Sequence, residues 1–140
     1  MRYLLFITTL IFSTKISLSD SIIDCNNFKG SQIYELNGKL INEDDAYSGQ
    51  TIKIHISKNE NIPPKVEWIG RNKFMVPIAW GKASQKEGWI NFFHYNPDVY
   101  RVYTFFQKKS QLALVEIQTQ LFTGASNVKS YIGSCNFYKK

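Results

Sequence analysis

Apolar and polar residues alternate along most of this chain with a period of two. In residues 51–57, Ile52, Ile54 and Ile56 alternate with polar side chains, which is typical of a half-buried β-strand. Residues 74–80 repeat the pattern. The same criterion predicts strands over residues 32–36, 39–41, 65–69, 89–95, 99–107, 112–121 and 128–137. No sustained helical spacing is present, so we expect an all-β protein.

Turn-forming residues separate the predicted strands and make successive hairpins. Asn37 and Gly38 are the two-residue hairpin signal, and residues 70–72, 96–98 and 123–127 are further reversals. Residues 42–50, 58–64 and 81–88 are predicted as loops. Pro77 cannot donate to a ladder, so its strand should lie at an edge or carry a bulge. About eight antiparallel strands in a meander predict a small up-and-down β-barrel, and a two-sheet β-sandwich is the alternative.

The first 19 residues have the pattern of a signal peptide. Arg2 precedes an uncharged run over residues 4–12, and Lys15 ends it. The run is too short to span a bilayer, and Ser17 and Ser19 place the expected cut before Asp20. We therefore predict a signal peptide over 1–19, one mature domain over 20–140, and no transmembrane segment after processing. The product should be exported, and either periplasmic or secreted.

The two cysteines lie near the two ends of the mature domain. In an oxidising compartment, two lone cysteines usually form one bridge. We therefore predict a disulfide between Cys25 and Cys135, whose Cα atoms must then lie within about 7 Å. The first and last segments should be neighbours, as closure of a barrel requires.

This predicted architecture, two bridged ends on a run of short strands, resembles the lipocalins and certain lysozyme inhibitors at the level of fold. Fold does not imply function, and no motif assigns the chain to either family. An inhibitor of a basic lysozyme should be acidic, whereas this chain carries a net charge of +6. Its basic residues are scattered, so we expect no nucleic-acid partner.

Catalytic and metal-binding motifs are missing from the sequence. His55 and His94 are the two histidines, and no serine or cysteine stands in a recognisable nucleophile setting. The acidic residues 43–45 lack the ligand spacing of a calcium loop. We expect no cofactor and no metal. The alternative is a small hydrolase-type enzyme whose loop-built site leaves no linear motif.

Aromatic residues, 15% of the chain, are the unusual feature. Both faces of residues 89–106 carry large apolar groups, although a strand pair buried on one face needs them on that face alone. Either another segment of the chain covers the second face, or the second face is a recognition surface. In residues 99–107 we assign the face with Arg101 outward, because an unpaired guanidinium is rarely left in a core. The sequence thus predicts a non-catalytic binding domain for a protein, a glycan or a small apolar ligand. The expected binding residues are Trp89, Phe93, Arg101, Tyr103 and Phe105.

Overall fold

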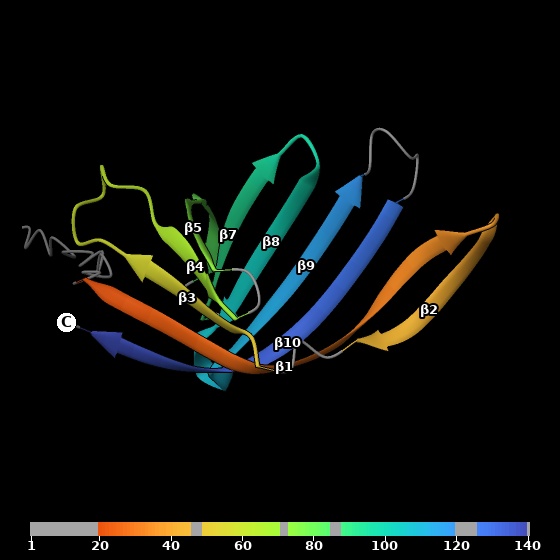
Figure 1. The fold of residues 1–140 in the computed structure, drawn as a ribbon. Coiled ribbons are helices and arrows are strands. Elements are labelled where there is room, and N and C mark those ends of the chain that lie inside the picture. The colour runs from red at the N-terminus through yellow and green to blue at the C-terminus, as the bar shows by residue number, and fades with distance from the viewer. Residues whose placement is uncertain (1–19, 46–48, 71–72, 85–87, 120–125, 140) are drawn as a thin grey trace, which may run out of the picture.

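The computed structural model describes residues 20–45, 49–70, 73–84, 88–119 and 126–139. Within these residues the chain forms strands and one short 3-10 helix (Figure 1). The strands are β1 (Ser21–Leu36), β2 (Lys39–Asp45), β3 (Thr51–Ile56), β4 (Lys65–Ile69), β5 (Phe74–Pro77), β6 (Ala79–Ser84), β7 (Trp89–Asn96), β8 (Val99–Phe106), β9 (Gln111–Thr119) and β10 (Ser126–Lys139), and η1 (Gln107–Lys109) is the 3-10 helix.

The strands form one antiparallel sheet that curls into a nearly closed barrel. Their order is β5-β4-β3-β1-β10-β9-β8-β7-β6, and only Ile78 separates the two end strands, β5 and β6, in the chain. The Ile78 N–H donates to the backbone oxygen of Pro64 at 2.8 Å. With β5 and β6 taken as one strand, the barrel has eight strands. The predicted meander barrel is therefore confirmed, and Pro77 lies in an end strand as expected.

Strand β1 is much longer than the sequence predicted, because it begins at Ser21 rather than at residue 32. Its first part pairs with β3 and its second part with β2, while β10 pairs along both. A bulge between Asn26 and Lys29 shifts the register and turns Phe28 into the core. Because the bulge breaks the alternation of apolar and polar residues, the sequence pattern did not predict this part of the strand. The second part of β1 forms with β2 a hairpin that projects from the barrel (Figure 1).

The disulfide joins the first and last strands of the barrel. Cys25 lies directly opposite Cys135 in the β1–β10 ladder, and the two are bonded with Cα atoms 4.0 Å apart. The predicted pairing and the meeting of the two ends are both confirmed.

Alternating side chains fill the barrel interior. Ile52, Ile54 and Ile56 are buried as predicted. The core comprises Ile23, Cys25, Phe28, Ile52, Ile54, Ile56, Val66, Trp68, Ile78, Ile90, Phe92, Tyr103, Phe105, Leu112, Leu114, Tyr131 and Cys135.

Two predicted loops are partly strand. β2 continues to Asp45, because residues up to Asp45 pair with β1, and Glu43 accepts a hydrogen bond from the Tyr34 hydroxyl at 2.8 Å. β6 continues to Ser84 opposite β7. Residues 46–48 and 85–87 of these predicted loops, and the predicted signal peptide over 1–19, lie outside the described residues.

Candidate functional site

The five residues predicted to bind a partner are divided between the two faces of the sheet. Trp89 and Phe93 point outward and are half-buried, opposite in alternation to the buried Ile90 and Phe92. Tyr103 and Phe105 are 0% and 1% exposed and belong to the core. Arg101 shares their face. The assignment of Arg101, Tyr103 and Phe105 to the exterior is therefore wrong.

Arg101 lies inside because the barrel supplies it with partners. Its Nε donates to Glu116, which lies directly opposite on β9 and is 1% exposed. The guanidinium also lies over the ring of Trp68, 5.4 Å from its centroid, and over the ring of Phe74, at 5.6 Å. Our expectation considered only an unpaired guanidinium. A paired and stacked one can be held in a barrel interior.

His94 and Gln118 complete this internal polar cluster. Arg101 Nη1 lies 3.1 Å from His94 Nδ1, and the Gln118 amide donates to Glu116 Oε1 at 2.6 Å. Desolvation lowers the pKa of His94 below its ordinary value of 6.5, and the Arg101 charge lowers it further, against the opposing effect of Glu116. Neutral His94 can therefore accept the Arg101 hydrogen bond at Nδ1. These groups are committed to one another, so the cluster is part of the barrel interior and not of the outward surface.

The outward side chains of β7–β10 form a surface with no formal charge. Successive side chains of a strand point to opposite faces of the sheet, and the charged residues Arg101, Glu116 and Lys129 point inward. Each lies two positions from a buried residue of the same strand: Arg101 from Tyr103, Glu116 from Leu114 and Lys129 from Tyr131. We call this surface the uncharged wall. Its members are Trp89, Asn91, Phe93, Tyr95, Tyr100, Val102, Thr104, Phe106, Gln111, Ala113, Val115, Ile117, Thr119, Val128, Ser130, Ile132, Ser134, Asn136 and Tyr138.

An apolar row crosses the uncharged wall. Tyr95 faces Tyr100, Tyr100 faces Ile117, and Ile117 faces Val128 in consecutive ladders. These side chains are 74%, 37%, 37% and 39% exposed. The Tyr100 ring stacks on that of Phe93 and meets the edge of Tyr95, each at a centroid distance of 6.4 Å. The row is thus a preformed aromatic and aliphatic surface in contact with solvent.

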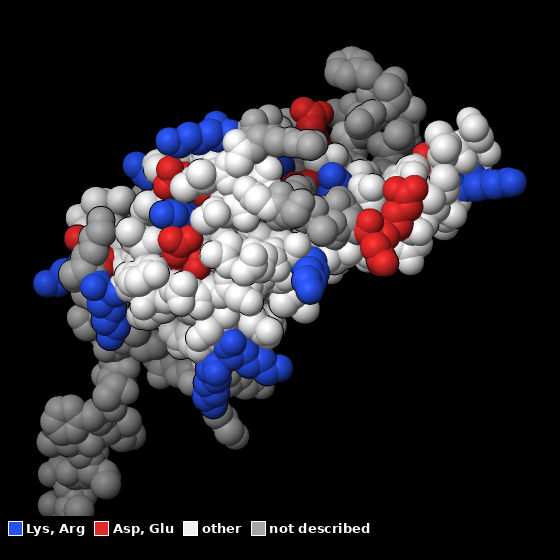
Figure 2. Space-filling view, turned by 60° about the horizontal axis from the view of Figure 1, so that its bottom comes forward, with Lys and Arg blue, Asp and Glu red and all other residues white. Residues whose placement is uncertain are grey.

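Charged side chains lie on other parts of the molecule. On the outer faces of β1, β3 and β4, Lys53 pairs with Asp24 at 3.2 Å, and His55 contacts Glu67 at 2.9 Å. Figure 2 shows separated charges around a broad uncharged area, with acidic side chains on the projecting hairpin at its right.

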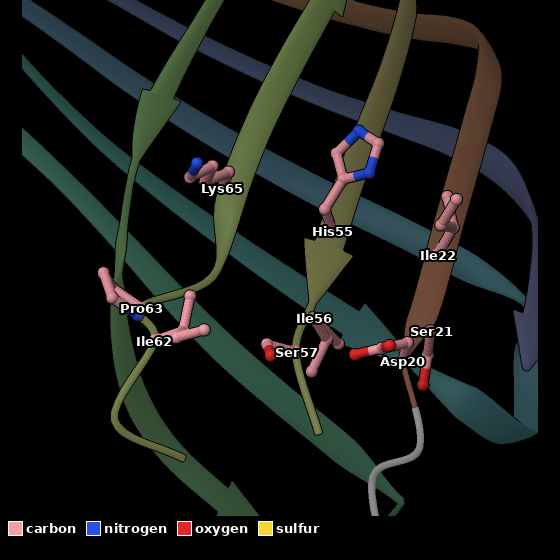
Figure 3. Close-up of a pocket in the computed structure, with 9 residues that line it drawn as sticks. All are labelled: Asp20, Ser21, Ile22, His55, Ile56, Ser57, Ile62, Pro63 and Lys65. Carbon is pink, nitrogen blue, oxygen red and sulfur yellow. The ribbon is translucent and has the colours of Figure 1, made fainter. Parts of the chain in front are cut away.

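A small hollow lies where β1 begins and β3 ends (Figure 3). Its volume is about 250 Å³, and it is lined by Asp20, Ser21, Ile22, His55, Ile56, Ser57, Ile62, Pro63 and Lys65. The Asp20 carboxylate accepts a hydrogen bond from the Lys58 backbone at 2.9 Å. His55 has its Nε2 on Glu67, which is the orientation of a general base held by a carboxylate.

Among the described residues, no three or more His, Cys, Asp or Glu side chains gather as a metal site would require. No helix in the same part of the chain is long and apolar enough to cross a membrane. Comparison with known protein families, curated proteins and solved structures finds no match to this chain.

Sequence reasoning identified two members of the uncharged wall, Trp89 and Phe93, but missed its central row. The signal was available in residues 112–117, where Glu116 has the same parity as Leu112 and Leu114. An acid on the buried face of β9 could have indicated an internal partner for Arg101. That would have reversed the faces of β8 and placed Tyr100 outside.

Proposed function

We propose that this chain is an exported, non-catalytic interaction domain that binds a protein through the uncharged wall. The observation that carries the proposal is the row of Tyr95, Tyr100, Ile117 and Val128, exposed by 37% or more on the outward face of β7–β10, whose other outward residues carry no formal charge. Large exposed apolar patches on soluble proteins mark interaction sites.

The wall favours a protein over a small ligand. Small apolar ligands bind in concave sites that bury most of their surface. The hollow is lined by residues of β1, β3, the segment after β3 and the start of β4, and by none of the wall. On the wall, the Tyr100 ring contacts those of both Phe93 and Tyr95, and such aromatic anchors dominate protein interfaces. A partner with an apolar, sheet-like or helical face of its own would fit.

Export to the periplasm or exterior is part of the proposal. The Cys25–Cys135 disulfide is compatible with an oxidising compartment. The signal-peptide pattern supports the same location, since it predicts removal of residues 1–19.

Site-specific crosslinking in the native host would test the proposed binding. A photoreactive phenylalanine analogue replaces Tyr100 in the wall, and the matched control places it at Met75, which is 51% exposed on β5. We expect a discrete crosslinked protein from position 100 and none from position 75. If position 100 gives no protein crosslink, or both positions give the same products, the interaction function is wrong.

A second candidate function, a small hydrolase-type activity, is favoured by the hollow. His55 lines it and is held by Glu67 at 2.9 Å, so His55 could activate a water molecule in the hollow. Hydrolysis of p-nitrophenyl esters by the mature protein would test this. A rate abolished by His55→Gln but retained by His94→Gln would support the enzyme, and a rate equal to buffer would exclude this esterase activity.

A further inference from the structure

The partner of the uncharged wall can be specified further, and this step rests on the proposed function. We propose that the wall packs face to face against the wall of a second copy of this chain, giving a two-fold symmetric dimer.

The charge distribution makes the wall compatible with itself. In a two-fold interface the same patch meets itself, so any charge near the axis faces a like charge. Arg101, Glu116 and Lys129 lie opposite one another across β8, β9 and β10, yet all three have the inward parity. The outward positions beside them are Tyr100, Ile117 and Val128 or other uncharged residues. Two copies can therefore meet on this face without a buried like-charge pair.

The wall supplies more than half of the area that a standard interface takes from each partner. Four strands spaced about 4.8 Å apart, each about eight residues long at about 3.3 Å per residue, give a flat footprint of roughly 500 Å². A standard interface takes about 800 Å² from each partner, with a polar rim around an apolar centre. The row of Tyr95, Tyr100, Ile117 and Val128 lies within this footprint as such a centre. Facing sheets of two copies would pack about 10 Å apart.

The projecting hairpin supplies part of the remaining area. Ile33 of β1 lies opposite Val128 and is 43% exposed, so it continues the row beyond β10. Farther along the hairpin, Leu40 lies opposite Glu35, two residues from Ile33 and on the same face, and is 80% exposed. A hairpin standing away from a barrel has little core of its own. Packing of the hairpin against the second copy would cover these side chains.

Sedimentation equilibrium of the mature, disulfide-bonded protein tests this dimer. The wall variants are Tyr95→Lys and Ile117→Lys, and the control is Met75→Lys, which introduces the same charge on β5 outside the wall. Tyr95 is 74% exposed, so its variant should fold even if Ile117→Lys does not. We expect a dimer at about 10 µM for the wild type and the control, and dissociation roughly 100-fold weaker for the wall variants, because symmetry buries two unpaired ammonium groups.

Three outcomes are distinguishable. A wild-type protein that stays monomeric at about 100 µM, or a dimer that both wall variants retain, overturns the dimer. If the protein is monomeric but position 100 crosslinks a different protein in the host, the interaction function stands and the second copy is wrong. If no protein crosslinks and no dimer forms, both proposals fail.

Discussion

Replacement of Arg101 with leucine tests the internal cluster on which the whole assignment of faces depends. The substitution leaves the Glu116 carboxylate, 1% exposed, with the hydrogen bond from the Gln118 amide but without the guanidinium. Removal of one member of a buried ion pair costs about 3–5 kcal/mol, because the other charge stays desolvated. Arg101 is itself 12% exposed at its side chain, which allows some water to reach the site. We therefore expect a loss of about 3 kcal/mol in the free energy of unfolding.

The double variant Arg101→Leu/Glu116→Leu separates this pairing from ordinary packing. Both charges are then absent, and the neighbouring inward residues Tyr103 and Leu114 are buried and apolar or aromatic. Replacing a whole buried pair with apolar residues is often close to neutral. We expect the double variant to lose about 1 kcal/mol, which leaves at least about 2 kcal/mol of coupling between the two positions.

Urea denaturation of the disulfide-bonded protein measures these differences. For a domain of about 120 residues, a loss of 3 kcal/mol also lowers the melting temperature by roughly 10–15 °C. An Arg101→Leu variant within about 0.5 kcal/mol of the wild type, with additive effects in the double variant, would refute the reasoning. Arg101 would then be solvent-exposed, and Tyr100 would not belong to the outer surface.

The remaining predictions concern the bridge, the histidine, a glycine and the N-terminus. Cys25→Ala/Cys135→Ala removes a link across 110 residues and should cost about 4–5 kcal/mol in urea denaturation. The lowered pKa of His94 means that its neutral form stabilises the fold above pH 6.5, and that this stability is lost as the pH falls through its folded pKa; His94→Gln should flatten a stability–pH curve in that range. Gly30→Ala should cost about 1–3 kcal/mol by thermal unfolding, because its Cβ would lie 1.8 Å from the Ser130 backbone oxygen. Intact mass spectrometry of the exported protein should show Asp20 as the first residue.

The barrel could be predicted from the sequence because each strand carries its own evidence. In β3, three isoleucines at alternate positions are all buried, and the Asn37–Gly38 turn joins β1 and β2 as its composition indicates. These signals are local, since alternation and turn chemistry depend on neighbours in the chain. The bridge of Cys25 with Cys135 added the one long-range constraint, which placed β1 beside β10.

The early part of β1 and the faces of β8 could not be assigned in the same way. Phe28 follows Asn27, whose φ of 54° belongs to the bulge, so the alternation changes phase within the strand. Taken alone, Arg101 predicts an outward position on β8. It can lie inward because it pairs with Glu116, which is 15 residues away in the sequence. A rule for single residues fails when the compensating group is on another strand.

The distribution of charge in β8–β10 runs opposite to that of an ordinary half-exposed sheet. Usually the apolar side of the alternation faces the core and the charged side faces water. Here Arg101 and Glu116 lie on the inner side, together with the buried Tyr103 and Leu114, while Tyr100 and Ile117 face solvent. Burial of an ion pair gives little net stability, and exposed apolar rows favour association. The stability of an isolated monomer therefore does not explain why the ion pair lies inside and the apolar row lies outside. The proposed covering of the outer face by a partner would explain both. Because charges on the inner side cannot repel a partner, the inversion that misled the sequence interpretation also leaves the wall without charges that would oppose the proposed binding.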